Sequence, residues 1–426
     1  MMRSAARIGL GLLFAGSMLF YVQGILVPYQ ERDAQLHNRP RGNLSDLYPQ
    51  WLAVRELLLN GRDPYSAEVT REIQTGFYGR PLDPALPDDP KDEQRFAYPV
   101  YVAFLLAPTI HLPFDFVQTV FLWLLVALTA VSALLWLDFL KWRPSGAVTL
   151  LALLLTLGSF SVIQGAKLQQ LSLLEGFLIA LSAALLAREY LFSSGAVMAL
   201  AMIKPQLAIP VAGWLFIWTI SDWRKRRGWV LGFGLTMVLL LAASEWLMPG
   251  WMTRFRDTAA AYRVYAANSG VLDTLFSPIG GRLLGVVLVV VVIALGLRFR
   301  SVQSSQVEFH RMTALVLAST LVILPMIVPY NHVLLLPSLF LLARQWPALS
   351  SHRLLSRALS IATAALIVLP WLVTTAMALF SAIAPAEQIE RARALPLIPS
   401  LFMPVAVFAL QLFSIATQST ENPESA

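Results

Sequence analysis

The chain of 426 residues contains no cysteine, which excludes disulfide bonds, thiolate metal sites and a cysteine nucleophile. Its five histidines are scattered, and no two have the short spacing that places two imidazoles on one metal ion. We therefore expect no protein-built metal site and no cofactor. Charge is scarce as well, at 13% of residues, about half the usual share of a soluble domain, so an ordinary soluble fold is excluded.

Apolar side chains make up 57% of the residues, as expected of a chain whose main solvent is membrane lipid. The net charge is +7, but the basic residues cluster between the apolar runs. Membrane topology explains that pattern without an acidic partner, so we expect no nucleic acid among the partners.

A membrane-spanning helix needs about twenty apolar residues, or fewer where neighbouring helices bury its ends. This rule predicts an all-α polytopic protein with about twelve spans and both termini inside. The predicted spans are 8–28, 114–137, 146–163, 170–187, 192–203, 206–221, 228–248, 278–297, 311–328, 332–345, 357–379 and 397–416.

The apolar segment around Lys204-Pro205 is either one kinked helix or a hairpin of two short helices. A single crossing would place the basic cluster Arg224 to Arg227 outside, against the preference of Lys- and Arg-rich loops for the cytoplasm. We therefore predict a hairpin that turns at Lys204. All other strongly basic loops then lie inside too, namely those at Lys141 and Arg143, Arg188, Arg298 and Arg300, Arg344, and Arg353 and Arg357.

This topology predicts one integral membrane domain over 1–417 in the cell (inner) membrane, followed by a disordered cytoplasmic tail over 418–426. Its largest extracytoplasmic loop is 29–97, and two smaller ones cover 249–277 and 381–396. The apolar stretch 98–113 is short and interrupted, so we expect it to be half-embedded or re-entrant.

The first outer loop contains an amphipathic pattern. Apolar residues recur at spacings of three and four, which places them on one face of a helix lying on the membrane or against the bundle. Pro49 suits its first turn and Gly61 the position just past its end. The residues on this face are Leu44, Leu47, Trp51, Val54 and Leu58.

Polar residues that interrupt apolar context fall on the outer side of the predicted topology. Ionisable groups at membrane depth are costly and are therefore candidates for function. Alternatives stay open for each: Asp46 caps the amphipathic helix, the lysines snorkel to the interface, and His332 is a packed core histidine. The outer-side residues are Asp46, Gln164, Lys167, Gln169, Gln170, Lys204, Asn331 and His332, with Arg254, Arg256, Tyr262 and Arg263 in the second loop.

Five motifs in this order resemble glycosyltransferase family 87. They are D-L-x5-A-x4-L-L-x-G-x-D-P-Y from Asp46 to Tyr65, F-A-Y-P ending at Pro99, a glutamine-bearing turn ending at Gln170, Ile203-Lys204-Pro205, and Pro329 to His332. The resemblance covers the chain to about residue 345. Two departures leave the sugar and the acceptor open: the turn reads Gln169-Gln170-Leu171-Ser172, and a single His332 follows Asn331.

The resemblance implies a GT-C fold and transfer of a hexosyl unit, typically mannose, from a polyprenyl-phosphate donor to a lipid or glycan acceptor. It implies Asp46 and His332 as catalytic residues and Lys204 as the family's lysine. We expect Lys204 and Lys167 to bind the donor phosphate, and Gln170, Asn331 and Tyr98 to contact sugar or acceptor.

One carboxylate suffices for such a reaction, because phosphate leaves as a stable anion and only the acceptor hydroxyl needs a base. Lysine supplies charge that a metal would otherwise give, so no divalent ion is required. Two other classes stay open at this point: a transporter or flippase of a lipid-linked sugar, and an envelope-polymer ligase or polymerase that takes a diphosphate donor.

Overall fold

The computed structural model describes residues 2–39, 45–266, 270–351 and 354–421. Within these ranges the chain is helical and forms no strand. Its first helical column is unbroken and runs through α1 (Met2–Phe20), a π-helical turn (Tyr21–Leu26) and α2 (Val27–Leu36). The first predicted span was to end at residue 28, so this helix ends eight residues later than expected.

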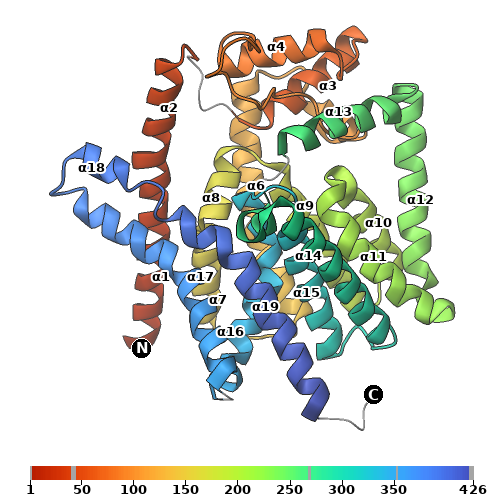
Figure 1. The fold of residues 1–426 in the computed structure, drawn as a ribbon. Coiled ribbons are helices and arrows are strands. Elements are labelled where there is room, and N and C mark those ends of the chain that lie inside the picture. Colours follow the sequence, from red (N-terminus) through yellow and green to blue (C-terminus); the bar gives the residue numbers. More distant parts are fainter. Residues whose placement is uncertain (1, 40–44, 267–269, 352–353, 422–426) are drawn as a thin grey trace.

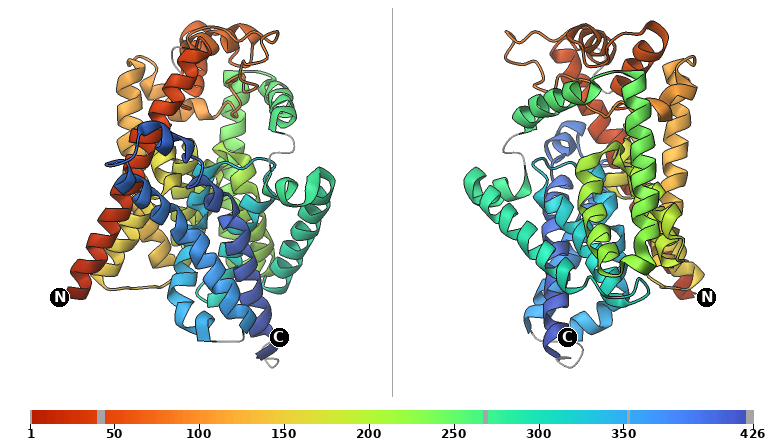
Figure 2. Two further views of the ribbon diagram at one scale, coloured as in Figure 1. Left: turned by 60° about the vertical axis from the view of Figure 1, so that its left-hand side comes forward. Right: turned by 90° about the vertical axis from the view of Figure 1, so that its right-hand side faces the viewer.

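Figures 1 and 2 show a bundle that has α3, α4 and α13 at one end and both chain termini at the other. The remaining helices are α3 (Tyr48–Asn60), α4 (Ala67–Tyr78), α5 (Val102–Leu106), α6 (Phe114–Phe139), α7 (Gly146–Leu157), α8 (Phe160–Lys167), α9 (Leu171–Ala187), α10 (Leu191–Leu200), α11 (Pro205–Ser221), α12 (Trp223–Leu247), α13 (Trp251–Ala266), α14 (Val271–Arg298), α15 (Val307–Ile323), α16 (Leu336–Ser351), α17 (Leu354–Phe380), α18 (Ala386–Arg391) and α19 (Leu397–Glu421).

Six helices of the described chain are long and apolar enough to cross a membrane, or seven if the bent pair α7 and α8 counts as one span. The protein is therefore a multi-pass membrane protein. The other predicted spans fall on shorter helices, among them α9, α10 and α11, so the count of about twelve stays a prediction. α15 is the central helix, because nearly every residue on it is buried, whereas α12 and α14 bury few side chains, as lipid-facing helices do.

The basic loops lie together at the end of the bundle that carries the termini. Arg188 pairs with Asp138 at 2.7 Å, and Arg344 donates a hydrogen bond to the carbonyl of Leu140 at 2.7 Å. Arg226 donates to the carbonyl of Arg300 at 2.9 Å. These contacts join the loops of Arg188 and Arg344 to the end of α6 and the loop of Arg226 to that of Arg300, while Arg353 lies outside the described residues.

The predicted break at Lys204 is also present. A short 3-10 turn (Ala201–Ile203) and Lys204 separate α10 from α11. α10 packs tightly on α12 because glycines line the crossing: a methyl group on Gly195 would lie 2.0 Å from the carbonyl oxygen of Trp229, and one on Gly232 would lie 2.0 Å from that of Phe192. Small residues allow such close backbone approach, which holds α10 against α12.

The amphipathic helix of the first loop is α3. Its first turn contains Pro49, and Gly61 ends it in the left-handed conformation with φ of 64°, as predicted. Trp51 and Val54 are buried, and the indole of Trp51 donates to the carbonyl of Thr109 at 3.2 Å. α3 therefore packs on α5 and the turn after it, so its apolar face lies against the bundle. Leu44 lies outside the described residues.

The two later outer segments are partly helical. α13 occupies most of the second, and α18 lies in the third. The third segment contacts the first helical column: Arg32 pairs with Glu390, the guanidinium of Arg393 lies 3.7 Å from the ring centroid of Tyr29, and the hydroxyl of Tyr21 donates to the carbonyl of Arg393 at 2.5 Å. At the carboxyl end, α19 continues to Glu421.

Candidate active site

Asp46 lies in a short turn that docks on the connection between α8 and α9. Its amide donates to the carbonyl of Leu168 at 2.9 Å, and the hydroxyl of Ser45 donates to the same oxygen at 3.2 Å. The Asp46 carboxylate does not cap α3, because no side chain among the described residues caps that helix and the amide of Leu47 donates to Ser45 Oγ instead. The capping interpretation of Asp46 is therefore wrong.

One amide joins Asp46 to Lys204. Gln170 Nε2 donates a hydrogen bond to Oδ2 of Asp46, and Gln170 Oε1 accepts one from Nζ of Lys204 at 2.7 Å. Asp46 comes from the first loop, Gln170 from the start of α9 and Lys204 from the turn before α11. Three predicted site residues, far apart in sequence, thus form one hydrogen-bonded chain.

Beyond Lys204 the chain of hydrogen bonds continues. Lys204 Nζ also donates to Ser172 Oγ at 2.8 Å, and Ser172 donates to Oδ1 of Asn331 at 2.8 Å. The rings of Tyr98 and Tyr330 have their centroids 5.6 and 5.4 Å from the ammonium group, within the range of cation–π attraction. The predicted contact residues Asn331 and Tyr98 are therefore both next to Lys204.

The environment of Asp46 tunes its basicity. Burial of the carboxylate raises its pKa to about 6, while the hydrogen bond from Gln170 and the charge of Lys204 oppose that rise. A carboxylate with a pKa near 6 is ionised at neutral pH and still a stronger base than an exposed one. This is the protonation behaviour that a general base needs.

Lys167 and His332 lie outside this hydrogen-bonded chain. Lys167 donates to Oε1 of Gln30 on α2 at 3.1 Å, so it is near Asp46 electrostatically but faces the first helical column. His332 is buried, and its Nδ1 has no hydrogen-bond partner within the described part of the chain. Together with Asn331 it lines a small space formed by Val271, the end of α15 and α19. The structure thus does not place the His332 ring at Asp46.

Glu175 is a residue that sequence reasoning missed. It lies on α9 one turn beyond Ser172, is fully buried, and neither carboxylate oxygen has a partner among the described residues. Its carboxyl group interacts electrostatically with the ammonium group of Lys204. The sequence contained a signal for Glu175, because it is a lone acid in the apolar run of α9. Burial of an acid is costly, so such residues are usually paired or functional.

A cavity of about 290 Å³ adjoins Asp46 on the side of the first helical column. It is polar and aromatic, and the loop after α4 closes part of it. The structure gives its lining as Tyr29, Gln30, Asp33, Ala34, Arg39, Asp46, Phe77, Tyr78, Pro90, Gln164 and Leu168.

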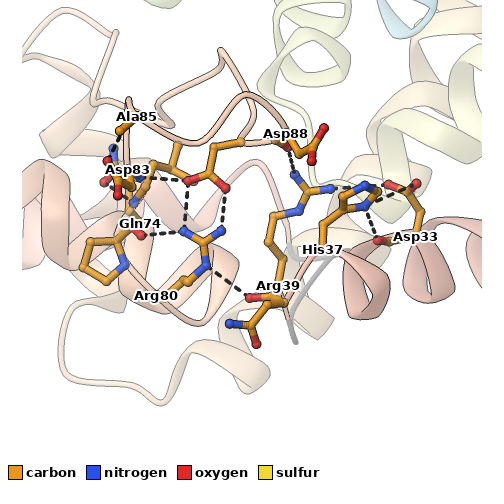
Figure 3. Close-up of polar contacts among 12 residues, drawn as sticks. Asp33, His37, Arg39, Gln74, Arg80, Asp83, Ala85 and Asp88 are labelled. Atoms are coloured by element: carbon orange, nitrogen blue, oxygen red, sulfur yellow. Dashed lines mark hydrogen bonds and ion pairs between the residues drawn. The ribbon is translucent and has the colours of Figure 1, made fainter.

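Arg39 on the cavity wall is held by neighbouring groups. Its Nη1 donates to the carbonyl of Asp88 at 3.0 Å, and its Nη2 lies 3.4 Å from Oδ2 of Asp33 (Figure 3). Arg80 pairs with Asp89 and donates to the carbonyl of Asn38 at 3.2 Å, which ties the loop after α4 to the end of α2. The wall is therefore cross-linked by ion pairs and hydrogen bonds.

The second outer segment contributes less to the site than expected. Arg254 pairs with Asp63 at 3.3 Å and Arg256 with Asp257 at 3.5 Å, so both arginines have carboxylate neighbours. Tyr262 lies on α13, close to Tyr98 and Tyr330. The side chain of Arg263 lies outside the described residues. Within the described chain, no group of three or more histidine or acidic side chains could hold a metal ion.

The sequence model of glycosyltransferase family 87 matches residues 96–329, more than half of the chain. The matched region includes Tyr98, Gln170 and Lys204, while Asp46 precedes it and Asn331 follows it. No curated protein matches the chain. The family resemblance of the motifs is confirmed, and it favours an enzyme over a transporter: the chain belongs to glycosyltransferase family 87.

Proposed function

We propose that this glycosyltransferase moves a hexosyl unit, with mannose the first candidate, from a polyprenyl-phosphate sugar to a hydroxyl group of a lipid or glycan acceptor. The observation that carries the proposal is the hydrogen-bonded chain from Asp46 through Gln170 to Lys204. A base and a cation joined by one neutral amide suit a reaction that removes a proton at one end of the substrate pair and releases a phosphate at the other.

In the proposed reaction the acceptor oxygen attacks the anomeric carbon from the face opposite the phosphate. The new carbon–oxygen bond forms as the bond to the phosphate oxygen breaks, and the hydroxyl proton moves to Asp46. Polyprenyl phosphate leaves with the bonding electrons as a stable anion, so no general acid is needed. A single displacement inverts the configuration at the anomeric carbon.

Lys204 is the proposed phosphate ligand. Its present partners, Gln170 and Ser172, are neutral, so a phosphate oxygen would gain a charge-assisted hydrogen bond that neither provides. Burial strengthens this attraction, because Lys204 is only 8% exposed. Lys167 is the second cation near Asp46, and Asn331 and Tyr98 are placed to contact the sugar. A catalytic role for His332 rests on the family resemblance alone.

We place the site on the extracytoplasmic face of the cell membrane. The support is the grouping of the basic loops and the site residues at opposite ends of the bundle. Basic loops stay in the cytoplasm, so the end with α3, α4 and α13 faces outward.

Transfer of radiolabel tests the proposal. The purified protein in nanodiscs is incubated with a lipid extract and labelled polyprenyl-phosphate mannose, glucose or galactose, or the corresponding diphosphate-linked sugars. We expect a labelled lipid or glycan from one monophosphate donor. Transfer from a diphosphate donor alone would favour the ligase or polymerase alternative and overturn the donor assignment.

The Lys204→Met variant separates donor binding from chemistry. Loss of a hydrogen bond to a charged group should weaken donor binding by about 1.5–3 kcal/mol, roughly 10- to 160-fold in Kd. Binding of the free sugar should not change. The matched control is Lys225→Met, because Lys225 is 84% exposed at the opposite end. Unchanged donor affinity in Lys204→Met would reassign the phosphate to Lys167.

A further inference from the structure

We propose that the cavity beside Asp46 binds the acceptor headgroup, and that this headgroup is an uncharged, hydroxyl-rich unit such as a sugar or polyol. The inference rests on the proposed function and names the substrate class of its second substrate. The cavity volume of about 290 Å³ is at the lower end of the roughly 300–1,000 Å³ of small-molecule sites, so it suits a terminal unit of the acceptor.

Asp46 separates two environments. On one side its carboxylate accepts from Gln170, which leads to Lys204, Ser172 and Asn331. Asp46 also lines the cavity, whose lining includes none of those four residues. The donor phosphate needs the cation, so the donor belongs to the Lys204 side. The cavity is then left for the acceptor, with its nucleophilic hydroxyl at the base.

The cavity lining suits hydroxyl groups. Asp33 supplies carboxylate acceptors, and the amides of Gln30 and Gln164 supply both donors and acceptors. Tyr29 and Phe77 add aromatic surface, and binding sites for small ligands combine such surface with a few placed polar groups. A ring with hydroxyls at its edge and apolar C–H groups on its faces matches this lining.

Charge disfavours an anionic headgroup. Lys167 lies behind the lining and donates to Oε1 of Gln30. The lining itself contains two carboxylates, Asp33 and Asp46, and one cation, Arg39. That cation is already held by Asp33 and by the carbonyl of Asp88. A carboxylate or phosphate in the cavity would therefore meet like charges, which costs affinity and excludes wrong partners.

The wall that carries Tyr29 is held in place from outside. The guanidinium of Arg393 stacks on the Tyr29 ring, and Arg32 pairs with Glu390. These contacts fix the aromatic face before a ligand arrives, and a pre-organised site loses less entropy on binding.

Binding of simple glycosides to the full-length protein in nanodiscs tests the inference without a donor. The probes are hexyl mannoside, glucoside and galactoside, and hexyl glucuronide as the anionic partner of the glucoside, all measured by isothermal titration calorimetry. We expect at least one neutral glycoside to bind, and the glucuronide to bind at least about tenfold more weakly than the glucoside. Equal binding of the glucoside and the glucuronide, or no binding of any neutral probe, would overturn the proposal.

Two variants locate the binding. Tyr29→Ala should weaken the neutral glycoside at least about tenfold, while Tyr29→Phe, which keeps the ring, should stay within about threefold. Asp33→Asn removes a like charge and frees Arg39, so it should improve glucuronide binding. The controls Tyr190→Ala and Asp138→Asn lie exposed near the opposite end and should change neither affinity. Unchanged glycoside affinity in Tyr29→Ala would sink the assignment.

The outcome also separates the two proposals. If neutral glycosides bind and Tyr29→Ala weakens them, but no polyprenyl-phosphate sugar supports transfer, the cavity assignment stands and the donor assignment falls. If transfer occurs and Tyr29→Ala leaves the KM for the acceptor unchanged, the cavity assignment falls alone.

Discussion

At the scale of single residues, the amide of Gln170 is the centre of the site. It has one donor end and one acceptor end, and the structure uses the donor for Asp46 and the acceptor for Lys204. The neutral side chain of Gln170 thereby holds the Asp46 carboxylate and the Lys204 ammonium close together, but the two charges do not form a direct ion pair. Gln170 was expected to contact sugar or acceptor, and its observed contacts with Asp46 and Lys204 lead us to propose a positioning role as well.

Replacement of Asp46 by Asn tests the base. Loss of a general base typically costs about 100- to 10,000-fold in rate, so turnover should fall by that factor while donor Kd stays near the parent value. Folding should be unaffected, because the Asp46 carboxylate caps no helix. Initial rates and thermal melting of Asp46→Asn measure both effects. Turnover within a few-fold of the parent would remove Asp46 from catalysis.

The pH dependence follows from the raised pKa of Asp46. An ionised base is required, and the pKa is about 6 because the carboxylate is buried. The kcat/KM should therefore be flat above that value and fall about tenfold per pH unit below it. The hydrogen bond from Gln170 lowers this pKa, so Gln170→Leu should move the acid limb to higher pH. An acid limb near pH 4, the usual range of an exposed aspartate, would contradict the assignment.

At the scale of helices, the sequence predicted features that depend on neighbouring residues. It did not predict features that depend on which helices pack side by side. Pro49, Gly61 and the spacing of apolar residues predicted α3, and the Lys204-Pro205 step predicted the break before α11, because both depend on nearby residues. The link through Ser172 and the burial of Glu175 depend on which helices pack side by side. The direction in which the His332 ring faces is also a packing outcome that residue spacing does not encode.

The crossing of α10 and α12 yields a stability prediction. Alanine at Gly195 would place a methyl group against backbone atoms of α12, which cannot move aside as a side chain does. Such overpacking costs about 1–3 kcal/mol, so Gly195→Ala should lower the melting temperature and weaken donor binding through displacement of Lys204. Gly213→Ala on α11 is the matched control, because nothing lies within 4 Å of its added methyl group. Equal melting temperatures for the two variants would show that the crossing tolerates the methyl group.

At the scale of the whole molecule, the absence of cysteine makes the topology directly measurable. A single cysteine at Gln206, an exposed position two residues after Lys204, is a unique label. We expect it to react with an impermeant thiol reagent added to intact cells, while a cysteine at Arg224 reacts only after the cytoplasmic side is opened. Labelling of Gln206→Cys from the cytoplasmic side alone would reverse the orientation of the bundle and of the proposed site.

The contacts of Arg393 with Tyr21 and Tyr29 determine when, during synthesis of the chain, the cavity wall is completed. Tyr21 and Arg393 are separated by 372 residues. The cavity wall that carries Tyr29 is therefore synthesised early, and Arg393, which contacts it, is synthesised near the end of translation. At roughly 5–20 residues per second, that interval is roughly 20 to 75 s. During it the nascent chain already contains Asp46 without the finished wall beside it. The enzyme therefore gains a braced cavity only when almost the whole polypeptide has been inserted.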